Sequence, residues 1–357
     1  MPDSTASPST SKLPSVNIAL PGRLVIQTGK WVWSTMWHTM VSQIAPRDKS
    51  GAYIRPDSQF RQWVRAERPE LESNPSDATY QAEAGRYRLY VGMGCPWAHR
   101  TLVVRALKGL TEAIPVTVVV PSVDDGGWVF EDQTEESTRG CRTLKEFYRL
   151  AQPGYGGRST VPLLWDSHTQ TIVNKESADI IVMLDREFNV VTQPLHPLLY
   201  PDDLKEKIDT WNKKIYHAVN NGVYRCGFAQ TQEAYNQACD ELFVMLDEID
   251  AVLTHQRYLC GANPTLADVR LFTTLFRFDI VYYGLFKCNR RRIQDYANLG
   301  PYLRDLYQLS GVADTCDLDA VKRDYYGNLF PLNPGQIIPR GPDIDNLWDP
   351  HERDRFS

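Results

Sequence analysis

The chain has 357 residues, of which 42% are hydrophobic and 23% are charged, and its net charge is −5 at pH 7. This length predicts about two domains with sizeable cores, and the acidic balance argues against a dedicated nucleic-acid-binding protein. The apolar runs are all shorter than the roughly 18 residues that a membrane span requires, so no membrane span is expected.

The seven cysteines fit neither a disulfide framework nor a common zinc site. Their number is odd and no two of them form a Cys-x-x-Cys pair, which favours a reducing compartment. They are Cys95, Cys141, Cys226, Cys239, Cys260, Cys288 and Cys316. The N-terminus lacks the basic start and the apolar run of a secretory signal. We therefore expect a cytoplasmic protein without a metal site.

Residues 1–80 are interpreted as an N-terminal extension that is partly disordered. Residues 1 to about 15 are rich in Ser, Thr and Pro, a composition typical of disorder. Between residues 24 and 45, Trp and Met recur at roughly helical spacing, which predicts a helix. Few basic residues accompany them, so packing against the rest of the protein is favoured over binding to a membrane surface. Residues 46–80 are polar, contain four prolines and are expected to be irregular.

Residues 81–193 carry the pattern of a parallel βαβ unit followed by a hairpin and a helix. The expected elements are a strand over 86–91, a helix over 96–109, a strand over 116–120, a hairpin of 161–165 with 171–173, and a helix from Glu176 or Ser177 to about 187. Residues 121–158 are expected to form a long connection, and long loops inside a compact domain are usually functional.

Residues 200–328 predict an all-helical domain, and the best domain boundary before it is 194–203. Apolar residues keep helical spacing through most of this part of the chain. Thr265 and Asp268 have the spacing of a capping box that opens a further helix. Residues 329–357 contain five prolines and no hydrophobic period. This last segment is expected to be an extended tail, packed on the surface or on a second subunit.

Cys95 gives the strongest chemical signal. It follows a predicted strand and the turn Gly92-Met93-Gly94, and it directly precedes a predicted helix. At such a position, unpaired N–H groups and the positive end of the helix dipole lower the pKa of a thiol, and the thiolate is the nucleophilic form. A buried, inert cysteine is the alternative. Ala98 stands where a resolving cysteine would be, so an external thiol such as glutathione would have to complete a thiol exchange.

Two further positions leave alternatives open. Val161-Pro162 opens a predicted strand, where a cis-proline would leave the backbone of Val161 free to pair with a thiol peptide and a trans-proline would merely begin the strand. Glu176-Ser177 begins a helix, and one role for the pair is simple N-terminal capping. In the other role, Ser177 and the helix N–H groups bind the carboxylate of a peptide while Glu176 faces an ammonium group.

Nine short segments spread along the chain occur together in one known family. They are Gly92-Met93-Gly94-Cys95-Pro96-Trp97-Ala98-His99-Arg100-Thr101, Gly127-Trp128-Val129-Phe130, Val161-Pro162-Leu163-Leu164-Trp165-Asp166, Asn220-Asn221-Gly222-Val223-Tyr224, Phe276-Arg277-Phe278-Asp279, Val281-Tyr282, Phe286-Lys287-Cys288-Asn289, Asn333-Pro334 and Gly341-Pro342. In this combination the chain closely resembles the glutathionyl-hydroquinone reductases, the Xi class of glutathione transferases, over roughly residues 45–355. The resemblance implies an α/β plus all-α fold, in which a thioredoxin-like N-terminal domain is followed by an all-helical glutathione-transferase C-terminal domain.

The resemblance also implies roles for individual residues. Cys95 is similar to the nucleophile of the family, Tyr224 to its proton-donating tyrosine, and Tyr282 and Tyr325 to tyrosines whose hydroxyls face the sulfur and favour its thiolate. The implied glutathione-binding residues are Trp128, Arg158, Ser159, Thr160, Val161, Glu176 and Ser177. Leu285 departs from the family, which usually has histidine before Phe-Lys-Cys. This difference bears on the substrate pocket or an interface and not on the thiol chemistry.

The implied reaction converts glutathionyl-hydroquinones to hydroquinones through a Cys95–glutathione mixed disulfide, which a second glutathione resolves to give oxidised glutathione. Glutathione is then a cosubstrate, no permanently bound cofactor is implied, and family analogy implies a homodimer. Two alternatives stay open. An omega-like thiol transferase or dehydroascorbate reductase would need the same cysteine, whereas a non-catalytic glutathione-transferase-like binding module predicts an unreactive Cys95.

Overall fold

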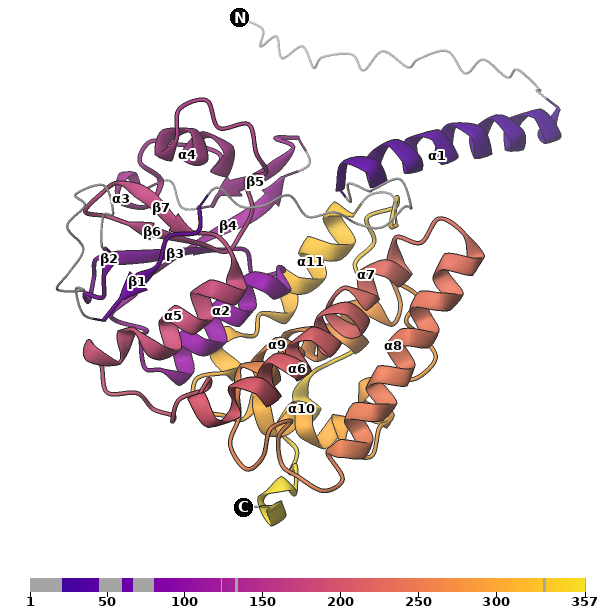
Figure 1. Cartoon of the computed structure of the whole chain (residues 1–357). Coiled ribbons are helices and arrows are strands. Elements are labelled where there is room, and N and C mark those ends of the chain that lie inside the picture. Colours follow the sequence, from indigo (N-terminus) through magenta and orange to yellow (C-terminus); the bar gives the residue numbers. More distant parts are fainter. Residues whose placement is uncertain are drawn as a thin grey trace, which may run out of the picture. The chain divides into compact units, whose positions relative to one another are not determined.

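The structure, a computed structural model, describes residues 21–44, 60–66, 80–122, 124–131, 134–329 and 332–356. The chain forms two compact units, Met1–Pro56 and Asp57–Ser357. The expected disorder of residues 1 to 15 lies outside the described residues, as does most of the segment 46–80. Figure 1 shows the helices and strands coloured along the chain.

The first unit contains the helix that the spacing of Trp and Met residues predicted. This helix, α1, extends over Gly22–Ile44. Its apolar side chains Leu24, Ile26 and Trp31 are 56%, 60% and 70% exposed. The expected packing of this segment against the rest of the protein stays a prediction. Within the described part of the chain, no helix combines the length and the apolar character that crossing a membrane requires.

A five-stranded sheet organises the first half of the second unit, with the strand order β5-β4-β3-β6-β7. The strands are β3 (Tyr87–Val91), β4 (Val116–Ser122), β5 (Gly127–Phe130), β6 (Leu163–Asp166) and β7 (Thr171–Asn174). Strands β3 and β4 run parallel and are joined by helix α2 (Pro96–Leu107), so the predicted βαβ unit is confirmed. The predicted hairpin is also confirmed, because β6 and β7 pair antiparallel.

Two helices cover the sheet and connect it to the rest of the second unit. Helices α2 and α5 (Ser177–Arg186) pack against each other, and α2 also packs against α9 (Leu266–Arg277), as can be followed in Figure 1. Between the strands and these helices, Leu89, Leu164 and Ile180 have no exposed surface. Burying a side chain of this size stabilises the fold by about 1.5–3 kcal/mol. The position of α2 is therefore set by packing on both of its sides.

Part of the expected irregular lead-in is ordered against the sheet. The backbone N–H of Gln62 donates to the carbonyl oxygen of Val173 at 2.9 Å, and Val64 is fully buried. A short parallel pair of strands forms between β1 (Val64–Arg65) and β2 (Tyr80–Gln81). Residues 60–66 therefore belong to the second unit, although they precede the first long strand.

The expectation of a long connection over residues 121–158 is wrong. The segment contains strand β5, the short helix α3 (Glu135–Thr138) and helix α4 (Leu144–Ala151). Helix α4 begins with a capping box, in which Thr143 and Glu146 each accept a hydrogen bond from the backbone N–H of the other. Burial of the apolar face of α4 then ties the segment to the sheet.

From residue 202 onward the regular elements are helical, as the apolar spacing predicted. Besides α9, they include α6 (Lys205–Ile215), α7 (Gly222–Gly227), α8 (Gln232–Val252), α10 (Leu299–Tyr307) and α11 (Leu318–Asn328). The predicted pair at the start of α9 is present, since the Asp268 carboxylate accepts from the N–H and the hydroxyl of Thr265 at 2.8 and 2.7 Å. A π-helical turn, Phe278–Tyr282, continues α9, and such turns are frequent at functional sites.

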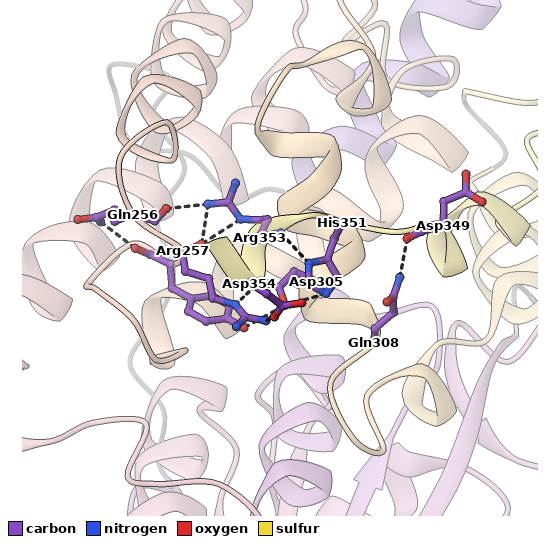
Figure 2. Close-up of polar contacts among 9 residues, drawn as sticks. Gln256, Arg257, Asp305, Gln308, Asp349, His351, Arg353 and Asp354 are labelled. Atoms are coloured by element: carbon purple, nitrogen blue, oxygen red, sulfur yellow. Dashed lines mark hydrogen bonds and ion pairs between the residues drawn. The ribbon is translucent and has the colours of Figure 1, made fainter. Parts of the chain in front are cut away.

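The C-terminal tail is bound to the helical part of its own chain, as Figure 2 shows. The side chain of Arg353 is 1% exposed, and one of its terminal nitrogens donates to the carbonyl oxygens of Leu253, Gln256 and Arg257 at 3.1, 2.7 and 2.8 Å. Arg257 in turn pairs with Asp305 of α10 at 2.8 Å. The end of the chain is thereby fixed to the carboxyl end of α8 and to α10.

The tail is less extended than its composition predicted. Two short 3-10 turns, Asp345–Trp348 and Arg353–Phe356, interrupt it. The side-chain amide of Gln308 donates to the carbonyl oxygen of Leu347 at 2.7 Å. It also donates to that of Asp349 at 2.9 Å, as Figure 2 shows, which adds a second attachment point. The tail was expected to pack either on the surface of its own chain or on a second subunit. Its described residues contact their own chain.

Candidate functional site

The turn between β3 and α2 places Cys95 at the amino end of a helix, as its position in the sequence predicted. Cys95 is the N-cap residue of α2 and is half-buried. Its N–H donates to the carbonyl oxygen of Gly92 at 3.0 Å, and its carbonyl oxygen accepts from the N–H of His99 at 3.0 Å. The backbone N–H groups of Trp97 and Ala98, in the first turn of the helix, favour the charged form of the sulfur, although the side chain of Cys95 forms no capping hydrogen bond. The helix end therefore presents its unpaired donors to the thiol.

The pKa of the Cys95 thiol is nevertheless raised above its usual value. Burial is the largest cause, because it removes water from the charged thiolate. The N–H groups of Ala98 and Trp97 and the positive charges of Arg277 and Arg100 lower the pKa, but they do not outweigh burial. The predicted lowering of this pKa is therefore wrong, since the helix end was considered without the cost of desolvating the sulfur.

The segment that precedes β6 approaches the same sulfur atom. The Val161–Pro162 peptide bond is cis, which is one of the two alternatives considered for it, and the Val161 carbonyl oxygen lies 3.8 Å from the sulfur of Cys95. The hydroxyl of Tyr148, on α4, donates to the carbonyl oxygen of Thr160 at 2.7 Å. The backbone of this segment is thus fixed beside the nucleophile by a helix that the sequence interpretation missed.

Arg158 and Ser159 lie on the approach to this segment. Arg158 is exposed, and its carbonyl oxygen accepts from the hydroxyl of Tyr155 at 3.0 Å and from the ammonium group of Lys175 at 3.1 Å. The hydroxyl of Ser159 is buried and has no hydrogen-bond partner in the described structure. Because Lys175 directly precedes Glu176, it connects the segment 158–161 to the start of α5.

Glu176 and Ser177 occupy the start of α5, as predicted. Glu176 is the half-buried N-cap residue, and its backbone N–H donates to the side-chain oxygen of Asn174 at 2.7 Å. Its carboxylate does not cap the helix, so simple capping by this side chain is not the role that the structure supports. Ser177 is the first helical residue and is 5% exposed. Their ligand-binding role stays a prediction.

Trp128 lies on the edge strand β5 and packs on the turn that leads to Cys95. A Cβ atom built on Gly92 would lie 2.3 Å from Cζ3 of the Trp128 ring, a distance that real Cβ atoms do not reach. Glycine at position 92 is therefore required for the indole to approach the backbone this closely. The contact brings Trp128 next to the turn that carries the nucleophile.

The three predicted catalytic tyrosines meet through their hydroxyl groups. The hydroxyl of Tyr325, on α11, lies 2.6 Å from that of Tyr224, on α7, and 3.0 Å from that of Tyr282, at the end of the π-helical turn. The ring of Phe286 packs within 6 Å of all three rings, between centroids. The structure thus joins residues that are separated by up to about a hundred positions in the chain.

Burial raises the pKa of all three tyrosines, so their hydroxyls remain protonated near neutral pH. The charge of a Cys95 thiolate adds to the rise for Tyr224 and Tyr282. Among the described residues, the sulfur contacts the carbonyl oxygen of Val161 at 3.8 Å, and the three hydroxyls contact one another instead. The predicted roles of the three tyrosines stay predictions, but Tyr224 and Tyr282 are close enough to Cys95 to feel its charge.

Two charged residues beside Cys95 were missed by the sequence interpretation. The guanidinium of Arg277 donates to the carbonyl oxygens of Met93 and Gly94 at 2.7 and 2.9 Å. The carboxylate of Asp324 accepts from the N–H of Gly94 at 3.0 Å, and burial raises its pKa to about 6. Arg277 stands in the family segment Phe276-Arg277-Phe278-Asp279, but no role was assigned to it, and Asp324 lies in no such segment. Both residues reach the turn from helices that follow it by more than 180 residues.

Two remaining expectations concern metals and Leu285. In the described segments, no group of three His, Cys, Asp or Glu side chains is arranged to hold a metal ion, and the seven cysteines are free thiols. Leu285 is 9% exposed and belongs to the hydrophobic core of the second unit. An apolar side chain at this position is therefore compatible with its surroundings.

Comparison with known proteins identifies the family. The family models "Glutathione S-transferase, N-terminal domain" and "Glutathione S-transferase, C-terminal domain" match residues 94–187 and 232–305. Glutathionyl-hydroquinone reductase YqjG of Escherichia coli (strain K12) is 43% identical over 331 residues, which cover 91% of this chain and 98% of the relative. Glutathione S-transferase omega-like 2 of Schizosaccharomyces pombe (strain 972 / ATCC 24843) is 42% identical over 296 residues, 80% of this chain and 94% of the relative.

Solved structures give the same result. The glutathione-bound structure of YqjG, described as a glutathione transferase homolog, is 44% identical and has a TM-score of 0.77, with 83% of this chain and 96% of that chain covered. The predicted fold, a thioredoxin-like part followed by a helical part, is thereby confirmed. Since the identity extends over most of both sequences, the chain belongs to the glutathionyl-hydroquinone reductases, the Xi class of the glutathione S-transferase superfamily.

Proposed function

We propose that this protein reduces glutathionyl-hydroquinones to hydroquinones, with Cys95 as nucleophile and glutathione as cosubstrate. The observation that carries the proposal is the arrangement around one sulfur atom. Cys95 stands at the amino end of α2 with Ala98, not a second cysteine, in the first turn of the helix. Three protonated phenols lie near it, two of which respond to its charge. A lone nucleophile with proton donors suits transfer of glutathione from carbon to sulfur.

The first step breaks a carbon–sulfur bond, for which an aromatic carbon is a poor leaving group. In the keto tautomer of the hydroquinone ring, the departing carbon leaves as an enolate. The Cys95 thiolate attacks the glutathione sulfur, the carbon–sulfur bond breaks, and the electron pair of that bond stays on the ring. Tyr224 donates the proton that the ring carbon takes up when the keto tautomer forms, and it recovers a proton from solvent. After cleavage, the enolate oxygen is protonated by solvent to give the hydroquinone. General acid catalysis of this kind contributes roughly 10²–10⁴-fold.

The second step regenerates the enzyme. The thiolate of a second glutathione attacks the mixed disulfide at the sulfur that belongs to the first glutathione, so that oxidised glutathione leaves with the Cys95 thiolate as leaving group. Together the two steps transfer two electrons from two glutathione sulfurs to the hydroquinone. Since the first turn of α2 offers no second cysteine, the mixed disulfide has no resolving partner there.

We further propose that glutathione binds along the segment 158–161 and the start of α5. The backbone of Val161 lies 3.8 Å from the nucleophile and is suited to pair with the backbone of a thiol peptide. Ser177 and the first N–H groups of α5 are suited to bind a carboxylate, while the carboxylate of Glu176 faces the ammonium group of the same peptide. Trp128 and the side chains of Arg158, Ser159 and Thr160 complete the proposed site.

The test is turnover of a glutathionyl-hydroquinone with glutathione, followed by formation of oxidised glutathione. Mass spectrometry after incubation with substrate alone is expected to show one glutathione on Cys95. Cys95→Ser is expected to abolish both the adduct and turnover while glutathione binding remains measurable by calorimetry. Cys141→Ser, at another half-buried cysteine, is the matched control and is expected to keep both. Normal turnover by Cys95→Ser would exclude the proposed mechanism.

A second candidate function is supported by the name of one relative. The protein of Schizosaccharomyces pombe is named an omega-like glutathione S-transferase, and an omega-like enzyme would use the same cysteine to reduce dehydroascorbate or glutathione mixed disulfides. Comparing kcat/KM for a glutathionyl-hydroquinone and for dehydroascorbate decides between the two. If neither is turned over and Cys95 resists alkylation, the non-catalytic binding module is the correct reading.

We also propose that the protein acts as a homodimer in the cytoplasm. Both points rest on family analogy and on the composition of the chain. Light scattering of the full-length protein is expected to give about twice the monomer mass of 40.8 kDa. Fluorescence microscopy of a tagged chain checks the location.

A further inference from the structure

Arg277 connects the helical part of the second unit to the turn that carries the nucleophile. It is the last residue of α9, and its side chain is 1% exposed. Its Nε donates to the carbonyl oxygen of Gly94 at 2.9 Å, and one terminal nitrogen donates to that of Met93 at 2.7 Å. The planar guanidinium thus binds two successive carbonyl groups directly before Cys95, an arrangement that a lysine cannot reproduce.

The remaining hydrogen bonds of Arg277 also go to neutral groups. Its other terminal nitrogen donates to the carbonyl oxygen of Thr273 at 3.0 Å and lies 2.8 Å from Nδ1 of His99. Burial, assisted by the charge of Arg277, lowers the pKa of His99 well below its usual value, so its ring is neutral. Its Nδ1 then accepts from Arg277, and its Nε2–H donates to the hydroxyl of Thr315 at 2.9 Å.

A buried positive charge is costly unless an anion lies nearby. In the described part of the chain, no carboxylate forms an ion pair with Arg277 within 4.0 Å. Within the described residues, five groups that can become negative feel its charge. Burial raises the pKa of Tyr282, Tyr325 and Cys316 so that they stay neutral near pH 7, which leaves Cys95 and Asp324 at the turn. Asp324 contacts the N–H of Gly94, and one of its oxygens is buried without a hydrogen bond. Besides the carboxylate of Asp324, the thiolate of Cys95 is the anion at the turn that the positive charge of Arg277 can stabilise.

Several other groups act on the same sulfur. From α2 itself, Arg100 and the N–H groups of Trp97 and Ala98 favour the charged form. From the helical part, Tyr224, Tyr282 and Tyr325 are neutral phenols, and Asp324 is a carboxyl that is largely ionised above about pH 6. Arg100 already donates to the side-chain oxygen of Asn220 at 2.6 Å and stacks on Trp97. Arg277 is therefore the cation best placed to respond to the charge of the thiolate.

We propose that Arg277 is a positioning residue of the reaction, which fixes the Met93-Gly94 turn and supplies the buried positive charge that stabilises the Cys95 thiolate. The proposal rests on the function proposed above, because it assigns Arg277 to that same nucleophile. It goes beyond that function in naming a residue outside the catalytic cysteine, the three tyrosines and the glutathione site. The geometry of the turn carries it, since the two carbonyl groups bound by Arg277 belong to the two residues that precede Cys95.

The test compares Arg277→Gln, which removes the charge, with Arg277→Lys, which keeps it. Iodoacetamide alkylation of Cys95 is measured between pH 6 and pH 10 in the full-length protein, and the Cys95 peptide is quantified by mass spectrometry so that the other cysteines do not contribute. At pH 8, Arg277→Gln is expected to alkylate Cys95 at least about tenfold more slowly, because loss of a nearby opposite charge shifts a pKa by about one to three units. Arg277→Lys is expected to remain within about threefold of wild type while kcat for the glutathionyl-hydroquinone falls.

Arg353→Gln is the matched control. Arg353 is also 1% exposed and also donates to backbone carbonyl groups, but it lies in the C-terminal tail and does not contact the turn (Figure 2). Its alkylation profile is expected to be that of wild type. Wild-type alkylation by a folded Arg277→Gln would overturn the proposal, and so would Arg277→Lys as slow as the glutamine variant. If Arg277→Gln does not fold, Arg277→Lys is the remaining test. Alkylation of its Cys95 that is at least about tenfold slower than in wild type would overturn the proposal.

Alkylation requires no substrate, so the test does not depend on the enzyme assay. If the wild-type protein fails to turn over any glutathionyl-hydroquinone, the proposed function is wrong while the alkylation profiles still measure the effect of Arg277 on the thiol. If turnover is present and the profiles coincide, the proposed function stands and the role of Arg277 is wrong.

Discussion

The hydroxyl oxygens of Tyr224 and Tyr325 lie 2.6 Å apart, and this contact joins α7 to α11 beside the nucleophile. The Tyr325 hydroxyl also lies 3.0 Å from that of Tyr282, so Tyr325 contacts both of the other phenols. A proton given up by Tyr224 can be replaced along this chain of hydroxyls. The contact therefore predicts that the tyrosines act as a group and not as three separate residues.

The first prediction concerns these hydroxyls. Tyr224→Phe removes the proposed proton donor and is expected to lower kcat by roughly 10²–10⁴-fold. Tyr325→Phe removes the hydrogen-bond partner of Tyr224 and is expected to lower kcat by a smaller factor. The matched control is Tyr326→Phe, whose hydroxyl instead donates to the carbonyl oxygen of Ile280 at 3.2 Å. Steady-state kinetics with a glutathionyl-hydroquinone measures all three, and full activity of Tyr224→Phe would remove the proton-donor role.

The second prediction concerns pH. Because burial raises the pKa of Cys95, only a minor fraction is thiolate at pH 7, and this fraction increases about tenfold per pH unit below the pKa. Alkylation of Cys95 and turnover are both expected to rise steeply from pH 7 towards pH 9. An alkylation rate that is already level at pH 7 would instead mean that the donors around the sulfur outweigh burial. Free glutathione, titrated alongside, serves as the reference thiol.

The third prediction concerns Asp324, whose pKa is raised to about 6 by burial. Between about pH 4 and pH 6 the native protein retains a proton that the unfolded chain has released, so the free energy of unfolding falls as the pH rises through this window. Asp324→Asn is therefore expected to be more stable than wild type at pH 7, by about 1–3 kcal/mol, with no such advantage at pH 4. Urea unfolding at both pH values measures the difference.

Asp319→Asn is the control for this experiment, since Asp319 lies on the same helix but is exposed. Its stability is expected to differ from wild type by less than about 0.5 kcal/mol at either pH. Asp324→Asn could be more stable than wild type at pH 7 and also less active. That result would mean that the carboxylate contributes to activity through the turn and not to stability. Equal losses of stability at both pH values would contradict the predicted pH dependence.

The fourth prediction concerns the tail. Arg353→Ala leaves three buried or half-buried carbonyl groups without their donor and is expected to lower the free energy of unfolding by about 1–3 kcal/mol. Arg355→Ala, at an exposed residue of the same turn, is expected to change it by less than about 0.5 kcal/mol. Urea unfolding measures both variants. Equal stability of the two would show that the tail is not attached through Arg353.

Local patterns were sufficient for the elements that carry the nucleophile. The alternating strand before Cys95, the proline that opens α2 and the Thr265–Asp268 pair each depend on neighbours within a few residues, and each is present. The segment 121–158 was misread although Thr143 and Glu146 had the spacing of a capping box. Its glycines and prolines dominated the interpretation, and a four-residue edge strand has too few residues to show a period.

The electrostatic character of the site could not be predicted in the same way. A helix end lowers the pKa of a thiol, but the opposing cost depends on how much of the chain packs over the sulfur, which local sequence does not reveal. Arg277 and Asp324 are ordinary residues of helices α9 and α11 until those helices are placed against the turn. The position of Cys95 before a helix indicated the cysteine without any family, whereas the three tyrosines were predicted only from the family resemblance, which transfers positions and not the contacts between them.

The separation between Gly94 and its two charged partners has a consequence for synthesis of the protein. Arg277 follows Gly94 by 183 residues and Asp324 follows it by 230. While the chain is made on the ribosome, the sheet can form long before either partner has emerged. During that interval Gly94 lacks both the guanidinium and the carboxylate that bind it in the finished protein, so the backbone before Cys95 is fixed only after the helical part has been made.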